Sequence, residues 1–149
     1  MSVELTPGGT RGATMPRIPR ALMKVLLPIG NLFLRSRGMR LLSLTTVGAR
    51  SGQEHTVYLS YFPDGDDAWL VVASFGGSPR HPAWYFNMAR NPDRIWVTIG
   101  DRRVRVRAES LAGEAREAAW RRIVAEQPIY GGYEQKTDRA IPVVRLTPA

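Results

Sequence analysis

The chain has 149 residues, 44% hydrophobic and 23% charged, which suits one soluble domain with a single core. It contains no cysteine and two histidines, which excludes disulfides and thiol nucleophiles, and we expect no metal cofactor. Residues 1–53 contain eight of the 21 Arg and Lys but one of the 13 acidic residues, so most of the net charge of +8 lies there. This front third predicts an acidic partner.

The first predicted elements are a tail and a helix. Residues 1–19, rich in Gly, Pro, Thr and Arg, predict a flexible basic tail before a single domain over 20–149. Residues 20–36 predict a kinked helix, interrupted by Pro28 and unable to span a membrane. Two interpretations stay open for residues 17–37: a helix packed on the core, or an amphipathic segment on an anionic membrane surface. No secretory signal is evident, so we expect a cytoplasmic protein, peripheral on the inner membrane face under the second interpretation.

The remaining elements predict hairpins. Strands are expected over 39–48, 55–62 and 68–74, then a helix from Pro82 to about Arg90, strands over 94–100 and 103–109, a helix over 113–127 and a strand over 141–147. Residues 103–109 alternate arginine with small apolar residues, which indicates a solvated strand face rather than a nucleic-acid site. The order predicts an α+β fold, an antiparallel barrel or sheet with peripheral helices.

Two glycine-containing stretches could bind an anion. GARSGQEH (48–55) offers backbone amides, a hydroxyl and a guanidinium to a phosphate, or is an ordinary exposed turn. ASFGGSPRHPAWYFN (73–87) combines a strand end, two glycines and a helix N-terminus, which favours close approach of an anion. In the alternative interpretation of 73–87, Trp84 and Tyr85 fill the core and His81 caps the helix.

A third stretch, PIYGGYEQKTDR (128–139), places Tyr130 and Tyr133 around another glycine pair. It predicts a mobile loop over a substrate, or else two packing tyrosines beside a turn.

Together these stretches resemble the deazaflavin-dependent nitroreductase family, whose signature is similar to TTxGRxSGxxR, VVASxGGxxxxPxWYxNLxxNP and TDRxIPVVxL. The resemblance spans residues 41–147. It implies a split β-barrel of the pyridoxamine-phosphate-oxidase-like kind. It also implies a reduced 8-hydroxy-5-deazaflavin cofactor, coenzyme F-420, with a phosphate and glutamates in its tail. Such an enzyme transfers a hydride to a quinone, an enone or a nitro compound.

The resemblance also implies roles for particular residues. Those for the anionic tail are Arg50, Ser51, Gly52, Gln53 and His55, where histidine replaces a usual arginine. Those around the ring are Ser74, Phe75, Gly76, Gly77, Pro82, Ala83, Trp84 and Asn87. As donors toward the acceptor we rank Tyr133 first, then Tyr130, with Ser74 as a third group. A non-catalytic module that binds deazaflavin or flavin mononucleotide stays open, as do a protein whose main function is at the membrane surface and a homodimer.

Overall fold

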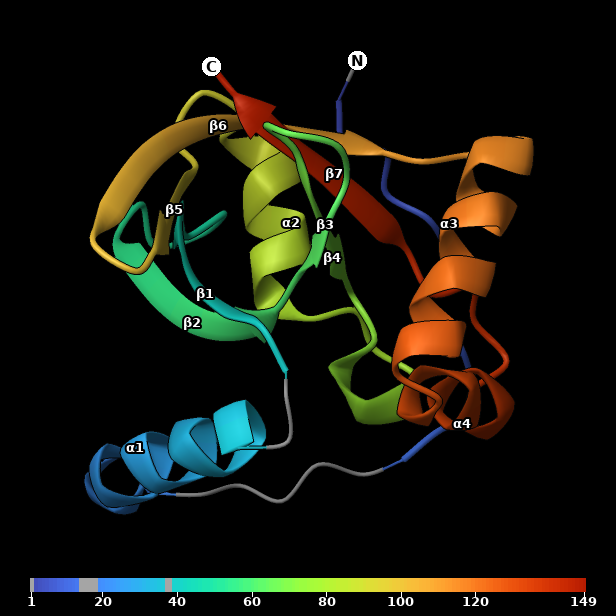
Figure 1. Ribbon diagram of the computed structural model, residues 1–149, viewed down its shortest axis with the longest axis horizontal. Helices are drawn as coiled ribbons and strands as arrows, with labels where there is room; N and C mark the ends of the chain where they lie inside the picture. Colours follow the sequence, from blue (N-terminus) through green and yellow to red (C-terminus); the bar gives the residue numbers. More distant parts are fainter. Residues whose placement is uncertain (1, 14–18, 37–38) are drawn as a thin grey trace.

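A curled antiparallel sheet forms the centre of the protein (Figure 1). The computed structural model describes residues 2–13, 19–36 and 39–149. Its elements are α1 (Arg20–Ser36), β1 (Leu41–Val47), β2 (Glu54–Ser60), β3 (Phe62–Pro63), β4 (Trp69–Val72), η1 (Phe75–Gly77), α2 (Ala83–Arg90), β5 (Trp96–Ile99), β6 (Arg102–Ser110), α3 (Gly113–Glu126), α4 (Ile129–Lys136) and β7 (Val143–Pro148). The strand order is β2-β1-β5-β6-β7-β4-β3, which confirms the predicted antiparallel α+β architecture.

Strand β6 joins the two halves of the sheet. Its first residues, Arg102–Arg105, pair with β5, and Val106–Ser110 pair with β7. Val106 and Ala108 are buried while the arginines between and before them are exposed, because successive side chains of a strand point to opposite faces. The predicted half-buried strand is therefore confirmed.

The helix α2 lies within the curl of the sheet (Figure 1). Its Tyr85 and Met88 are fully buried against barrel residues such as Leu44, Val97 and Leu146. Burial of side chains of this size contributes roughly 1.5–3 kcal/mol each, so α2 is fixed in place by the core. A cavity wall built on α2 is consequently rigid.

Strand β4 separates two apolar clusters. Val71 faces the barrel core, whereas Leu70 and Val72 pack with Trp120 and Ile123 of α3. All four residues of β4 are buried, as its apolar sequence predicts. The strand ends at Val72, and Ser74 follows two residues later, immediately before the turn η1.

The predicted mobile loop over 128–139 is wrong, because residues 129–136 form the helix α4. Neither Gly131 nor Gly132 has a positive φ. A Cβ at Gly131 would lie 3.3 Å from Val124 Cγ1, so the missing side chain lets α4 approach α3 closely. Gly131 therefore serves helix packing, whereas a Cβ at Gly132 would meet no other atom.

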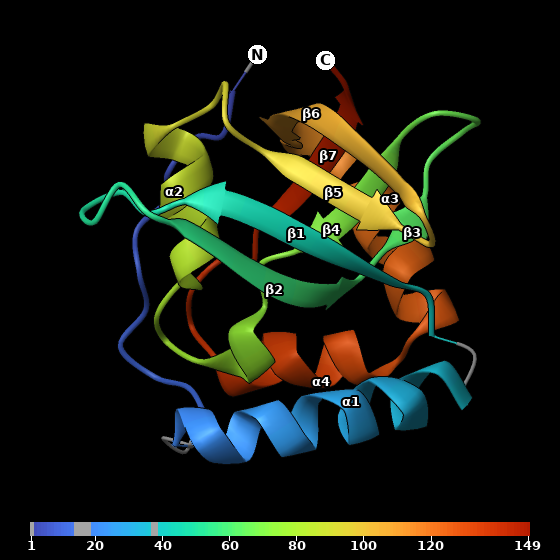
Figure 2. The same ribbon diagram turned by 90° about the vertical axis from the view of Figure 1, so that its left-hand side faces the viewer.

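The described residues before α1 lie along the domain. Residues 2–13, here called the N-terminal strap, have no regular secondary structure, yet Val3 is buried and Glu4 N donates to Ser110 Oγ (3.0 Å). The flexibility expected for 1–19 stays a prediction, and residues 14–18 lie outside the described residues. Helix α1 has the predicted bounds, runs through Pro28, and lies at the lower end of the molecule in both views, below β2 (Figure 2).

Candidate functional site

The loop after β1 is closed by its own backbone. Gly48 N donates to the Gln53 carbonyl (2.8 Å), and Gly52, whose φ is 68°, donates back to the Gly48 carbonyl (3.0 Å). The Ser51 hydroxyl accepts a hydrogen bond from Gln53 N (3.2 Å) and lies 3.3 Å from His55 Nε2. The closed loop presents the cationic Arg50 at its exposed tip.

Asn87 of α2 holds this loop from inside. Its Oδ1 accepts a hydrogen bond from Ala49 N (3.0 Å), and its Nδ2 donates to Thr46 Oγ1 (3.1 Å). Asn87 is 7% exposed and Thr46 is buried as well, so the contact between them is shielded from water, whereas the contact with Ala49 is half-buried. Asn87, one of the residues predicted to contact the cofactor ring, therefore also fixes the loop that is predicted to bind the cofactor's tail.

The turn after β4 has an unusual backbone. Phe75, Gly76 and Gly77 have φ values of 45°, 63° and 81°, all in the left-handed region. Phenylalanine rarely adopts such a φ, which costs about 1–3 kcal/mol and persists only where the surrounding structure holds it. The glycines accept the conformation without a Cβ clash, and Phe75 is left 41% exposed.

Arg139 imposes this conformation from behind the turn. Its guanidinium donates to the carbonyl oxygens of Ser78 (2.8 Å), Ala73 (3.0 Å) and Ser74 (2.7 Å). Arg139 is 5% exposed, and no carboxylate lies within ion-pair distance of it among the described residues. Because its buried charge is satisfied mainly by backbone carbonyls, moving the turn would leave a buried cation without acceptors.

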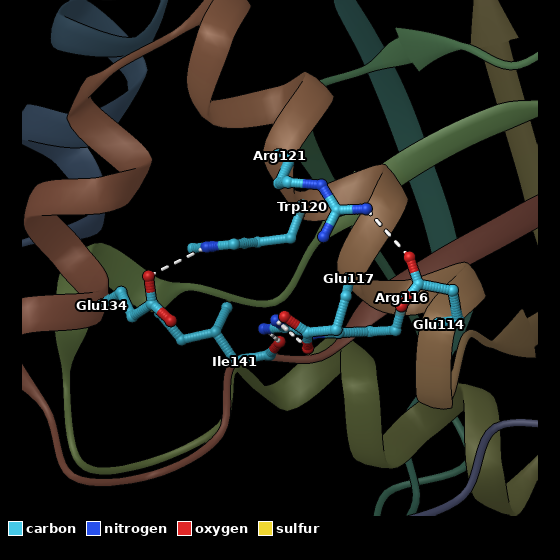
Figure 3. Close-up of polar contacts among 7 residues, drawn as sticks. All are labelled: Glu114, Arg116, Glu117, Trp120, Arg121, Glu134 and Ile141. Atoms are coloured by element: carbon cyan, nitrogen blue, oxygen red, sulfur yellow. Dashed lines mark hydrogen bonds and ion pairs between the residues drawn. The ribbon is translucent and has the colours of Figure 1, made fainter.

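Helix α4 brings both predicted tyrosines to the site and is tied to α3. Glu134 of α4 accepts a hydrogen bond from Trp120 Nε1 (2.9 Å), as Figure 3 shows, and Arg116 donates to the Ile141 carbonyl after α4 (2.7 Å). The rings of Tyr130 and Tyr133 lie 5.7 Å apart, edge to face. Burial raises the pKa of Tyr130, an effect that the Ser60 side chain partly opposes, so its phenol stays protonated at neutral pH.

Two cavities meet at Trp84. The loop cavity, of about 690 Å³, is lined by Arg50, Ser51, His55, Ala83, Trp84 and Asn87 among the predicted residues. The turn cavity, of about 870 Å³, is lined by Ser74, Phe75, Gly76, Pro82, Trp84, Tyr130 and Tyr133 among them. The site thus gathers residues from three separate stretches.

Three predicted residues line neither cavity. Gly52 and Gln53 close the loop from its exposed side. Gly77 is buried behind the turn, where a Cβ would lie 3.1 Å from the Tyr133 carbonyl oxygen. These residues shape the walls of the cavities rather than face into them.

The structure adds residues that sequence reasoning missed. The turn cavity is also lined by Met39, Leu41, Tyr58, Leu59, Ser60, Val72, Gln127, Pro128 and Ile129. Most belong to β1, β2 and the start of α4, and only the curl of the sheet brings them to the turn. Arg139 is the last residue of the tyrosine stretch 128–139 and belongs to the motif TDRxIPVVxL, but its sequence position does not indicate its contacts with the turn. His81 does not cap α2 but contacts Arg139 and Thr6.

The comparisons with known proteins agree with this geometry. A sequence profile of the F420H(2)-dependent quinone reductase family matches residues 27–148. The chain belongs to this family. The present chain is 43% identical to F420H(2)-dependent quinone reductase Rv1261c of Mycobacterium tuberculosis over 110 residues, which cover 71% of the present chain and 72% of the relative.

Three solved structures share the fold of this chain. An F420-H2 dependent reductase, FDR-A, aligns with a TM-score of 0.64 and 40% identity over 72% of this chain and 93% of its own. A structure described as a domain-swapped dimer aligns with a TM-score of 0.64 and 33% identity over 83% and 98% of the two chains. A Listeria innocua protein described provisionally as a pyridoxamine 5'-phosphate oxidase shares the fold at 16% identity, with a TM-score of 0.53 over 80% and 91% of the two chains. The predicted split barrel is confirmed.

This reductase is therefore an oxidoreductase of a family that depends on reduced F420 and reduces quinones. The donor set fits such a cofactor, because the loop cavity offers a guanidinium and polar groups to an anionic tail and the turn cavity offers apolar and aromatic walls to a ring. Among the described residues, no cluster of three His, Cys, Asp or Glu could hold a metal ion.

Proposed function

We propose that the protein transfers a hydride from reduced coenzyme F-420 to a quinone, with the cofactor's tail in the loop cavity and its ring and the acceptor in the turn cavity. The observation that carries the proposal is the meeting of these cavities at Trp84, one beside Arg50 and the other beside two phenols. The cofactor supplies the hydride when bound. Enones and nitro compounds are further acceptors that share the need for a hydride and a proton.

The chain's own residues would hold the reactants and handle the proton. Arg50, Ser51 and His55 would bind the anionic tail, while Trp84 and the Phe75–Gly76 turn would orient the ring. A quinone that gains a hydride also needs one proton, and a phenol beside its oxygen can donate a hydrogen bond as negative charge develops. We place Tyr130 first for this role and Tyr133 second, the reverse of the order expected from the sequence, because Tyr130 is buried and lies by the Ser60 side chain. Ser74 is the third donor.

Titration with reduced coenzyme F-420 tests the binding half of the proposal. Trp84 lines both cavities, so we expect quenching of tryptophan fluorescence and much weaker binding of flavin mononucleotide. Equal affinities, or tighter binding of flavin mononucleotide, would overturn the choice of cofactor. The catalytic half is tested by adding a soluble quinone and following cofactor oxidation. Tight binding without oxidation would instead support the non-catalytic module.

Helix α1 supports a second partner, an anionic membrane surface. None of the helices in the described ranges is long and apolar enough to cross a bilayer. However, one face of α1 exposes a row of large apolar side chains at helical spacing: Leu22, Val25, Leu26, Ile29 and Leu32. The strong excess of basic residues over 1–53 matches the charge of such a surface. We propose that this face lies on the membrane.

A homodimer stays a proposal. It is supported by the relative described as a domain-swapped dimer and by the exposed edge strand β2. Light scattering after size-exclusion chromatography would decide between one copy and two.

A further inference from the structure

The N-terminal strap contacts the back of the turn that forms the cofactor cavity. Gly9 N donates to the Pro79 carbonyl (2.8 Å), and Ala13 N donates to the Gly77 carbonyl (3.0 Å). The strap is therefore hydrogen-bonded directly to residues that follow Phe75 and Gly76. It precedes residue 27, where the match to the family begins.

The glycines of the strap provide close approach rather than flexibility. A Cβ at Gly12 would lie 2.6 Å from Pro79 N and closer still to the Gly77 carbonyl oxygen. A Cβ at Gly9 would lie 3.0 Å from Arg139 N and would overlap Asp138 Oδ1. Neither glycine has a positive φ, so the backbone conformation does not require glycine. Glycine is required at both positions because a Cβ would clash with neighbouring atoms.

The strap also contacts the segment that carries Arg139. Asp138 Oδ1 accepts hydrogen bonds from Thr10 N (2.8 Å) and Arg11 N (3.0 Å), and Oδ2 accepts one from the Thr10 hydroxyl. These hydrogen bonds lower the pKa of Asp138 to about 2, so the carboxylate is ionised throughout the neutral range. The strap thus anchors the residue next to the buried guanidinium.

A third contact runs through His81. Arg139 Nη1 lies 3.1 Å from His81 Nδ1, and because arginine can only donate, Nδ1 accepts. The proton of the neutral ring is then on Nε2, which donates to the Thr6 carbonyl of the strap (2.8 Å). The strap, His81, Arg139 and the turn therefore form one continuous hydrogen-bonded network.

We propose that the strap is a positioning element of the cofactor site: residues 6–13 hold Arg139 and the 77–79 backbone, and thereby keep Phe75 and Gly76 in the left-handed conformation that shapes the turn cavity. The strap does not line the loop cavity or the turn cavity, so it acts through the turn. The proposal rests on the proposed function only for its effect on cofactor affinity. Its effect on the turn is independent of any ligand.

The chain offers a matched pair of variants. Gly12→Ala would force the strap away from Gly77 and Pro79, whereas Gly8→Ala adds the same methyl group where it meets only the Pro79 carbonyl oxygen, at an ordinary 3.4 Å. Asp138→Ala removes the three hydrogen bonds to Thr10 and Arg11 without a new clash, and Asp67→Ala removes the same charge from an exposed site. Asp138→Ala decides the question if Gly12→Ala does not fold.

Amide hydrogen exchange on the ligand-free protein is the first measurement. We expect faster exchange over residues 73–79 in Gly12→Ala and Asp138→Ala, and parental exchange in Gly8→Ala and Asp67→Ala. Titration with reduced coenzyme F-420 is the second, and we expect affinity to fall roughly fivefold or more in the first pair only. Faster exchange confined to residues 2–13, or equal affinities in all four variants, would overturn the proposal. Failure of the parent protein to bind the cofactor would overturn the proposed function instead, while the exchange measurement would still test the strap.

Discussion

Tyr130 and Tyr133 lie one turn apart on α4 with their rings 5.7 Å apart, and both line the turn cavity. Tyr130 is buried and also contacts the Phe62 ring edge to face, whereas Tyr133 is partly exposed. The ring of Tyr130 is thus fixed by contacts with both Phe62 and Tyr133.

We expect Tyr130→Phe to lower kcat by roughly 10- to 100-fold, about 1.4–2.7 kcal/mol of barrier, because it removes the donor to the acceptor oxygen. Cofactor affinity should stay unchanged, since phenylalanine keeps the aromatic ring that lines the turn cavity and the loop cavity is untouched. Tyr133→Phe is the matched control and should have a smaller effect. Parental turnover in both variants and in the double variant would make the tyrosines packing residues and leave Ser74 or water as the proton source.

Arg50→Ala should weaken binding of reduced coenzyme F-420. Loss of a charge-assisted hydrogen bond predicts a cost of about 1.5–3 kcal/mol at low salt, shrinking as salt screens this exposed site. Arg107→Ala removes the same charge from an exposed position on β6 and serves as the control. An unchanged dissociation constant for Arg50→Ala would show that the loop does not contact the tail.

Asn87→Ala should lower both stability and cofactor affinity. The substitution leaves Ala49 N and the buried Thr46 hydroxyl without their partner, which predicts a loss of about 1–3 kcal/mol of unfolding free energy. Asn91→Ala is the control, because Asn91 joins the same helix to the Val47 carbonyl outside the loop. Urea unfolding should show a loss in both variants, and titration should show a loss of affinity only in Asn87→Ala. Equal cofactor affinities in Asn87→Ala and Asn91→Ala would show that the loop after β1 does not contribute to cofactor binding.

The exposed face of α1 makes a direct prediction about membranes. The parent protein should sediment with anionic phospholipid vesicles and be released by salt. Ile29→Asp or Leu32→Asp, at positions 62% and 71% exposed, should abolish sedimentation without unfolding the domain. Leu5→Asp places the same charge at a 53% exposed position in the strap and should have no effect. Equal loss in all three variants, or no sedimentation of the parent, would contradict the proposal.

Local patterns predict the sheet of this protein well. The alternation in 103–109 and the apolar run 68–74 each report the side-chain environment of a single strand, and both are confirmed. The same reasoning fails for 128–139, because the glycine pair that signals a turn in isolation lies within the helix α4, where Gly131 allows close packing against α3. Gly131 is read correctly only when Val124 is known to be its neighbour.

The candidate site, like the sheet, is predicted from local sequence only in part. The stretches 48–55 and 73–87 contain residues of both cavities, but nothing local indicates that Tyr58 and Ser60 of β2 complete the turn cavity. Gly9 and Gly12 suggest flexibility by composition, whereas their close contacts depend on Asp138 and Gly77, which are distant in the chain. Contacts of such long sequence separation leave no periodic signal.

His81 predicts a pH dependence of stability. Burial lowers the pKa of His81, the hydrogen bond with the Thr6 backbone opposes this, and the Arg139 charge lowers it further. The rings of Tyr85 and Phe86 pack against it, so the described charged group facing His81 is Arg139. A proton on Nδ1 would place two donors and two positive charges face to face.

The sign of the effect follows from proton binding. The unfolded histidine has a pKa near ~6.5, and the folded pKa is lower, so below that value the unfolded chain binds a proton that the folded protein rejects. The contribution of His81 is fully present above about pH 6.5 and is lost as the pH falls toward the folded pKa. Asp138 acts in a separate window, because its contribution is fully present above the unfolded pKa of about 4 and is lost as the pH falls toward its folded pKa of about 2.

Urea unfolding between about pH 5 and pH 7.5 measures this dependence, and we expect the unfolding free energy to decrease as the pH falls through the lower half of that range. His81→Gln keeps one acceptor for Arg139 and one donor for Thr6 but cannot titrate, so it should flatten the dependence. His55→Gln is the matched control, because it removes an exposed imidazole whose hydrogen-bond partner is Ser51 of the β1–β2 loop rather than Arg139 or the strap. Amide protection factors over 73–79, taken relative to the intrinsic exchange rate at each pH, should fall in the parent at low pH, since the protonated ring would release Arg139 from the turn. A pH dependence that is the same in His81→Gln as in the parent would assign the effect to another group.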